Sequence, residues 1–158
     1  PPLLYDLVRE LRERMPNVVA DLPLTNAWSY KYEQDRPAMG IGPHADYGKV
    51  NLNFWVTPDE ANLNPDTGGL RIWEEPPKVD DFVQANMVPE SWTEGIPFVD
   101  VPHRCNRGVV FDSKLIHTTM PFFFRPGYKN MRINITLIFG KGEFSNFRNE
   151  EIVREGKG

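Results

Sequence analysis

The hydrophobic pattern predicts one helix at the start of the chain. In residues 3–15, LLYDLVRELRERM, apolar side chains recur every three or four positions with charged side chains between them, as in an amphipathic helix. Pro16 is expected to end this helix, because proline lacks the N–H group that a helix interior needs. The side chains expected to form the apolar stripe are Leu3, Leu4, Leu7, Val8, Leu11 and Met15.

Beyond this helix the pattern predicts short β-strands. Each candidate strand is bounded by Gly, Pro, Asn or Asp, and most alternate between apolar and polar residues; the segments are AWSYKYE, VNLNFWV, GGLRIWEE, RGVVFDS, KLIHTTM and MRINITLIFG. Short strands separated by turn residues are typical of a β-sandwich or a double-sheet jelly roll. We therefore predict a mainly β fold, a double-stranded β-helix (jelly roll) with an N-terminal helix.

Two segments lack this clean alternation. The stretch from Glu75 to Asn106 is rich in proline and acids, and we expect a long ordered loop that is either a functional lid or a surface insertion. We expect it to border a pocket mouth together with PFFFRPGY, residues 121–128. Phe122, Phe123 and Phe124 are expected in a core or interface rather than against a substrate, and alternation would turn Phe123 the opposite way from its neighbours.

Composition narrows the class of protein. The 158 residues suffice for one domain, residues 1–158, although a chain that starts at Pro1 is also compatible with a piece of a longer protein. A formal charge of −4 and a pI of about 5.4 offer no general basic surface for nucleic acid. No apolar run reaches the roughly 18 residues of a membrane span. The single cysteine, Cys105, cannot form an internal disulfide, which favours a reducing, cytoplasmic location. We expect its side chain to pack inside.

A possible metal site lies in GIGPHADYGKVNLNFWVTP, residues 40–58. His44 and Asp46 are two positions apart, so in the strand where we expect them they share a face. Two histidines and one carboxylate suit non-haem Fe(II), because they leave coordination positions open. His117, on a late predicted strand, would complete this set, and His103 is the less favoured rival. The alternative is a solvated turn with structural histidines.

A possible anion site lies in RINIT, residues 132–136. Alternation places Arg132, Asn134 and Thr136 on one face of the predicted strand. Burying a guanidinium is costly unless an anion accompanies it, and its fork of donors matches a carboxylate. The anion is either an internal Asp or Glu or a ligand. Arg125 is the rival, but it sits in a turn, RPG, that fixes a side chain poorly.

These motifs, taken in order from Trp28 to Phe139, resemble the 2-oxoglutarate/Fe(II)-dependent dioxygenases, and most closely their prolyl-hydroxylase-like branch. The resemblance rests on His-x-Asp, the Gly-Gly-Leu strand, RGVVFDSKLIH and RINIT. It implies that His44, Asp46 and His117 bind Fe(II). It also implies that Arg132 holds the distal carboxylate of 2-oxoglutarate. The other residues that it places at the cosubstrate or in its pocket are Tyr32, Asn53, Trp55, Thr119 and Asn134.

The resemblance implies an enzyme that couples oxidative decarboxylation of 2-oxoglutarate, with O2, to hydroxylation of a substrate. That substrate, a small molecule or a protein side chain, is not readable from the sequence. Asp46 is a carboxylate, whereas halogenating relatives lack one there. Two features depart from the family: the long spacing between His117 and Arg132, which keeps Arg125 as an alternative, and Asn53 at a position that is usually apolar. A cupin-like metalloenzyme without 2-oxoglutarate and a non-catalytic jelly-roll binding module are the competing hypotheses.

Overall fold

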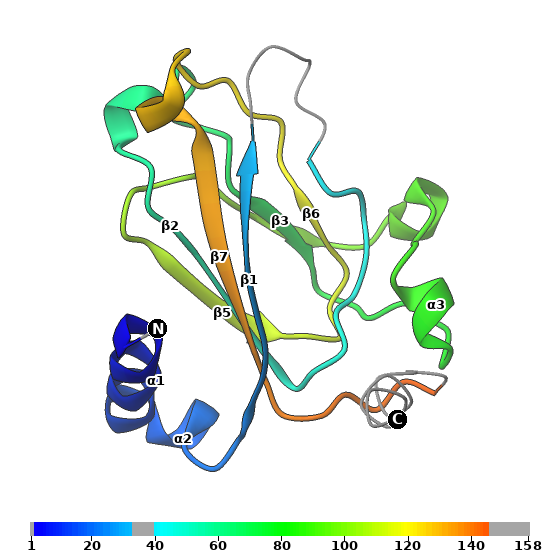
Figure 1. Ribbon diagram of the computed structural model, residues 1–158. Coiled ribbons are helices and arrows are strands. Elements are labelled where there is room, and N and C mark those ends of the chain that lie inside the picture. The colour runs from blue at the N-terminus through cyan, green and yellow to red at the C-terminus, as the bar shows by residue number, and fades with distance from the viewer. Residues whose placement is uncertain (1, 33–39, 146–158) are drawn as a thin grey trace, which may run out of the picture.

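Two antiparallel β-sheets and an N-terminal helix form the part of the chain that the computed structural model describes, residues 2–32 and 40–145 (Figure 1). One sheet has the strand order β1-β7-β2-β5, and the other has the order β4-β3-β6. The strands are β1 (Leu24–Tyr32), β2 (Val50–Trp55), β3 (Leu70–Trp73), β4 (Phe98–Val101), β5 (Gly108–Asp112), β6 (His117–Thr119) and β7 (Arg132–Phe139). The predicted mainly β class is thus confirmed. Glu33, the last residue of the first predicted strand, lies outside the described residues.

The predicted helix is present as α1 (Pro2–Arg14) and covers the outer face of the first sheet (Figure 1). Pro16 does end α1, but it also opens a second short helix, α2 (Pro16–Val19), since proline is well tolerated in a first turn. Leu3 is 78% exposed, so the expected apolar stripe does not include it. The remaining stripe residues pack against Val19, Leu52, Leu137 and Phe139; they are Leu4, Leu7, Val8, Leu11 and Met15.

The alternation along β2 divides its side chains between two environments. Leu52 points toward α1, whereas Trp55 points between the sheets and packs with Leu70 and Ile72 of β3. The amides Asn51 and Asn53 lie on the same inward face as Trp55, and both are buried. The space between the sheets therefore has an apolar end and a polar one.

Strand register sets the order of side chains along this interior. In the β1–β7 pair, Tyr32 is opposite Arg132 and Trp28 is opposite Thr136. In the β2–β7 pair, Asn53 is also opposite Thr136. The sequence placed Arg132, Asn134 and Thr136 on one face, and all three are buried. Their common inward direction is thereby confirmed.

The stretch from Glu75 to Asn106 is more ordered than a long loop. It contains α3 (Phe82–Ala85), a 3-10 turn at Glu90–Thr93 and strand β4. The prediction missed β4, which pairs with β3, because three of its four residues are exposed and their polarity does not alternate. Two further 3-10 turns lie at Asp59–Ala61 and Tyr128–Asn130.

Two smaller predictions had opposite outcomes. Phe122 and Phe124 are buried in the core while Phe123 is 58% exposed, as the alternation predicted. The expectation that Cys105 packs inside is wrong: its side chain is exposed, in the turn that precedes β5. Neither α1 nor any other described helix has the length and apolar character needed to cross a membrane.

Candidate metal centre

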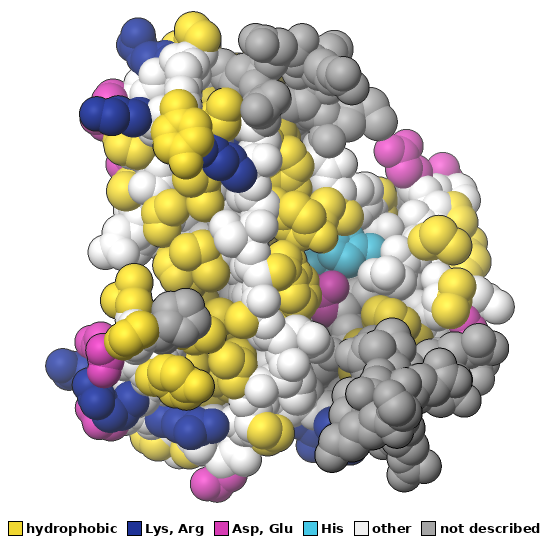
Figure 2. Space-filling model, in the orientation of Figure 1, with side chains coloured by type: hydrophobic (Ala, Val, Ile, Leu, Met, Phe, Trp, Pro, Cys, Tyr) yellow, Lys and Arg dark blue, Asp and Glu magenta, His cyan; other side chains and the backbone are white. Residues whose placement is uncertain are grey.

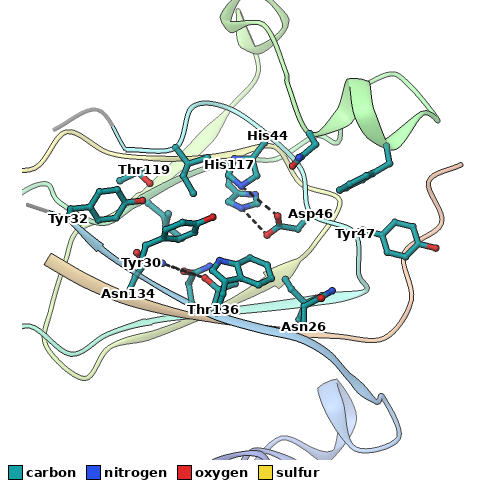
Figure 3. A pocket seen from close by; sticks show the side chains of 17 residues that line it. Asn26, Tyr30, Tyr32, His44, Asp46, Tyr47, His117, Thr119, Asn134 and Thr136 are labelled. Carbon is teal, nitrogen blue, oxygen red and sulfur yellow. Dashed lines mark hydrogen bonds and ion pairs between the residues drawn. The ribbon is translucent and has the colours of Figure 1, made fainter. Parts of the chain in front are cut away.

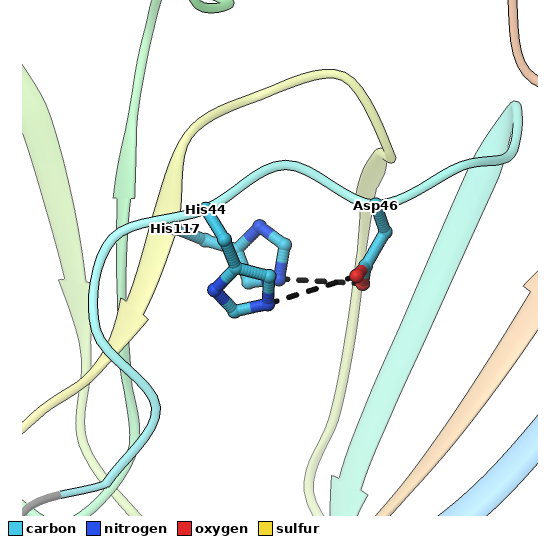
Figure 4. Close-up of side chains that lie close together, drawn as sticks. All are labelled: His44, Asp46 and His117. Carbon is cyan, nitrogen blue, oxygen red and sulfur yellow. Dashed lines mark ion pairs between the residues drawn. The ribbon is translucent and has the colours of Figure 1, made fainter. Parts of the chain in front are cut away.

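The three side chains predicted as metal ligands converge on one point (Figure 4). The Nε2 atom of His44 is 3.6 Å from Asp46 Oδ1, and the Nε2 atom of His117 is 3.4 Å from Asp46 Oδ2. One ligand atom from each residue lies within 4.8 Å of the others. The side chains are 3–12% exposed. This spacing is that of a two-histidine, one-carboxylate cluster around a single ion.

Backbone hydrogen bonds hold the two histidines side by side. His44 and Asp46 lie in an extended segment before β2 and not in a strand as predicted, but they still face the same way. The N–H group of His44 donates to the carbonyl of His117 at 3.0 Å, and the reverse bond measures 2.9 Å. The N–H group of Asp46 donates to the carbonyl of Ser113 at 2.9 Å. The ligand segment is thus fixed to β6 and to the turn that precedes it.

Each imidazole is oriented by a second hydrogen bond. Nδ1 of His44 is 2.8 Å from the carbonyl oxygen of Gly42, and Nδ1 of His117 is 3.0 Å from that of Leu115. A carbonyl oxygen only accepts, so in both rings Nδ1 carries the proton. Nε2 is therefore the nitrogen that each ring turns toward Asp46.

The protonation states suit a divalent ion. Burial and the neighbouring His117 lower the pKa of His44 to about 4, so this ring is neutral at neutral pH. Burial raises the pKa of Asp46, but the hydrogen bond and charge of His117, the charge of His44 and the hydrogen bond from Asn51 outweigh it. The pKa of Asp46 consequently lies below its usual value. A neutral imidazole and a carboxylate are ready ligands for a hard-to-borderline cation.

A row of side-chain amides connects this cluster to Arg132; we call Asn51, Asn53 and Asn134 the amide chain. Asn51 Nδ2 donates to Asp46 Oδ2 at 2.5 Å, and Asn53 Nδ2 donates to Asn51 Oδ1 at 3.0 Å. Asn134 Nδ2 donates to Asn53 Oδ1 at 3.2 Å, and an N–H of Arg132 donates to Asn134 Oδ1 at 3.0 Å. The alternation of Asn51 and Asn53 was the sequence signal that these amides share a face.

Arg132 is a buried cation without a carboxylate partner among the described residues. It is 1% exposed, and burial lowers its pKa to about 10. Besides Asn134 it donates to the carbonyl oxygens of Gly68, at 2.6 Å, and Gly69, at 3.3 Å. A guanidinium has five N–H groups, so donors remain. The rival Arg125 is exposed and donates to the carbonyl of Glu60.

The cluster opens into a pocket of about 480 Å3 between the sheets (Figure 3). Histidine and acidic atoms are visible in a hollow of the surface in Figure 2. Tyr32 and Thr119 lie at one end of the pocket and Tyr47 lies at the other, with the cluster between them (Figure 3). Asn53 and Asn134 also line the wall.

Other predicted residues lie outside this pocket. Among the described residues that line it, neither Arg132 nor Trp55 appears; the Arg132 guanidinium is 5.3 Å from the centre of the Tyr32 ring, and Trp55 lies in the core. His103, the rival ligand, is likewise buried away from the cluster, between the rings of Trp55 and Phe124. Neither ring nitrogen of His103 has a hydrogen-bond partner.

Part of the pocket lining was not predicted from the sequence. Trp28 and Tyr30 line it from β1, and the alternation in AWSYKYE was a usable signal for them. Phe82 and Asn86 line it from the stretch between Glu75 and Asn106, which supports the expected position of that stretch at the pocket. PFFFRPGY does not line the pocket, contrary to expectation.

Comparison with known proteins finds a likeness in fold but none in sequence. No protein-family profile matches the sequence, and no curated protein matches it. Among solved structures, the non-heme alpha ketoglutarate dependent epimerase SnoN from nogalamycin biosynthesis has a TM-score of 0.53 and 16% identity. The match covers 84% of this chain and 53% of SnoN.

A second solved structure gives the same result. The N-substituted L-amino acid dioxygenase from Burkholderia ambifaria AMMD, in complex with alpha-KG, has a TM-score of 0.50 and 14% identity. That match covers 84% of this chain and 62% of the dioxygenase. The chain thus spans less than two thirds of either protein. At these identities the likeness shows a shared fold.

Proposed function

We propose that this protein is a non-haem Fe(II) oxygenase that uses 2-oxoglutarate and O2 to hydroxylate a substrate. The observation that carries the proposal is that Arg132 is buried and has no carboxylate partner among the described residues. The same interior also holds the two-histidine, one-aspartate cluster. An isolated buried cation is costly, and an anionic cosubstrate would relieve that cost. The jelly-roll topology and the prolyl-hydroxylase-like branch are part of this proposal.

The donor set fits iron. His44 and His117 would bind through Nε2, because their Nδ1 atoms are engaged by backbone carbonyls. Asp46 would supply the third ligand as a carboxylate. Three protein ligands leave open positions for a chelating cosubstrate and O2. When bound, iron and 2-oxoglutarate would activate O2, which is the oxidant for both 2-oxoglutarate and the substrate, and the chain would supply ligation, orientation and exclusion of water.

The residues around Arg132 fit a dicarboxylate. Tyr32 lies beside Arg132 in the strand register, and burial raises the pKa of its phenol, so the phenol stays protonated and can donate. Thr119 lies at the same end of the pocket (Figure 3). We propose that Arg132, Tyr32 and Thr119 hold the distal carboxylate, with Asn53 and Asn134 forming the adjacent wall. A charge-assisted contact from Arg132 would orient the cosubstrate toward the cluster.

The opposite end of the pocket is the proposed substrate side. Asn26 and Tyr47 lie there (Figure 3), and Trp28, Phe82 and Asn86 contribute to the same lining. Apart from the cluster, no Asp, Glu, Lys or Arg among the described residues lines the pocket. An aromatic and amide lining favours a neutral group at the reacting carbon. The side chains that line this end of the pocket include no general base, and the proposed chemistry requires none.

The test needs no knowledge of the substrate. Purified protein is titrated anaerobically with Fe(II) and 2-oxoglutarate while the charge-transfer absorption of the complex is recorded. Slow succinate release is then measured in air. Both signals are expected, each dependent on 2-oxoglutarate. Metal binding without either signal would favour the cupin-like metalloenzyme, and absence of metal binding would favour the binding module.

A further inference from the structure

We infer that Asn51 is a positioning residue for the metal-binding carboxylate, and that the amide chain links this carboxylate to the Arg132 guanidinium. The inference rests on the proposed function, because it takes Asp46 to be a metal ligand. It goes further by assigning a role to three buried amides. None of them is required by a two-histidine, one-carboxylate cluster as such.

The contact between Asn51 and Asp46 is short for an amide donor. The Asn51 Nδ2 atom lies 2.5 Å from Asp46 Oδ2, which is shorter than the roughly 2.7–2.9 Å usual for an N–H donor and an ionised oxygen. Asn51 is fully buried, so no water competes for its donors. Asp46 Oδ2 is therefore held in one orientation, which fixes the other oxygen, Oδ1, on the side of His44.

The bonds of the amide chain all run in one direction. Arg132 donates to Asn134, Asn134 to Asn53, Asn53 to Asn51, and Asn51 to Asp46. Each amide thus presents its oxygen toward the cation and its NH2 group toward the carboxylate. Hydrogen bonds aligned in this way polarise one another in a low-dielectric interior. A positive charge at one end and a negative charge at the other favour this single orientation.

The amide chain is buried along its length, and Asn53 and Asn134 also line the pocket. The exposed fractions are 0% for Asn51, 3% for Asn53, 7% for Asn134 and 1% for Arg132. Thr136 supports it from the side by donating to Asn53 Oδ1 at 2.9 Å. Inward positions of neighbouring strands would otherwise hold apolar residues. A row of buried amides is stable only when its polar atoms have hydrogen-bond partners. The amide chain meets this condition because its last NH2 group, on Asn51, donates to Asp46.

The hydrogen bond from Asn51 would control how many oxygens of the Asp46 carboxylate bind the metal. Because Oδ2 already accepts from Asn51 and Oδ1 does not, we infer that Asp46 binds the ion through Oδ1. Ligation through one oxygen leaves more positions for a chelating cosubstrate and O2 than ligation through two. Residues that orient a ligand in this way usually change metal affinity when they are replaced.

The experiment compares Mn(II) affinity among folded variants by calorimetric titration. Asn51→Leu keeps the approximate size but removes the donor, and we expect its affinity to fall by about 10- to 100-fold. Asn53→Leu breaks the chain one step further away, so its loss is expected to be smaller but still measurable. Thr57→Val is the matched control, because it removes two partly buried hydrogen bonds, to Met131 and from Ile133, that do not belong to the amide chain.

A second measurement separates positioning from a merely structural role. The visible absorption of bound Co(II) reports its coordination, and we expect it to change in Asn51→Leu but not in Thr57→Val. If Asn51→Leu does not fold, Asn53→Leu carries the test. Wild-type protein that binds no metal would overturn the proposed function. Wild-type protein that binds Mn(II), with both asparagine variants binding it equally well, would overturn the amide-chain inference alone.

Discussion

The backbone N–H groups of His44 and His117 each donate to the carbonyl oxygen of the other residue, at 3.0 and 2.9 Å. This exchange joins a segment before β2 to the start of β6 and brings the two imidazole rings to 4.2 Å between their centres. Because the bonds are made by the backbone, they do not depend on the side chains that they position. Replacing either histidine should therefore leave the local fold in place while removing a ligand.

Metal binding is the first prediction. We expect His44→Ala, Asp46→Ala and His117→Ala each to weaken Mn(II) or anaerobic Fe(II) binding by more than about 100-fold, since each removes a ligand rather than a residue behind one. Calorimetric titration measures the affinity. His103→Leu is the control, because His103 lies outside the cluster. Unchanged affinity in His117→Ala would contradict the assignment of the ligands.

The second prediction concerns the cosubstrate. Arg132→Ala should weaken 2-oxoglutarate binding by about 10- to 100-fold, because a charge-assisted contact is worth roughly 1.5–3 kcal/mol. Arg132→Lys should recover only part of this loss, since an ammonium cannot reproduce the planar fork. Titration of the charge-transfer absorption in iron-loaded protein measures the affinity.

The matched control is Arg125→Ala. Arg125 is exposed and its Nε donates to a backbone carbonyl, so its removal should leave 2-oxoglutarate affinity unchanged. Loss of the signal in Arg125→Ala, with Arg132→Ala unaffected, would keep the oxygenase assignment and move the carboxylate anchor to Arg125.

The third prediction is a pH dependence of stability that comes from His103. Burial, together with the nearby charge of Arg132, lowers the pKa of His103 from 6.5 to about 4. The unfolded chain therefore binds a proton more readily than the folded one. The stabilising effect of the neutral ring is present above pH 6.5 and is lost as the pH falls toward 4, by up to about 3 kcal/mol.

His103→Leu should remove this part of the pH dependence. Urea unfolding of wild type and variant at several pH values between 7 and 4 measures the free energy of unfolding. His44 also has a lowered pKa, but it is present in both proteins, so the difference isolates His103. Equal pH slopes in the two proteins would show that His103 is not buried as a neutral ring.

The fourth prediction concerns the Gly-Gly step before β3. A Cβ atom at Gly69 would collide with the backbone carbonyl oxygen of Val101 and lie 2.9 Å from the N atom of His103. We expect Gly69→Ala to destabilise the protein by about 1–3 kcal/mol, which lowers the thermal midpoint by several degrees. Gly108→Ala is the control, since nothing lies within 4 Å of its added Cβ. A thermal midpoint unchanged in Gly69→Ala would contradict the close approach.

The local features of this protein could be predicted from its sequence. Helix α1 and most strands followed from the period of their apolar residues, because that period is a property of neighbouring positions. The shared face of Arg132, Asn134 and Thr136 followed in the same way. Strand β4 did not, since its exposed residues carry no alternating pattern.

Which strand faces come into contact could be seen only in the tertiary structure. His44 and His117 were candidates from composition and resemblance, but their approach depends on a backbone exchange between distant segments. The amide chain also requires the register of β2 against β7, which brings Asn53 beside Thr136. The exclusion of His103 from the cluster depends on its burial between Trp55 and Phe124. Such contacts depend on the packing of whole sheets, so the spacing of apolar residues within one segment cannot predict them.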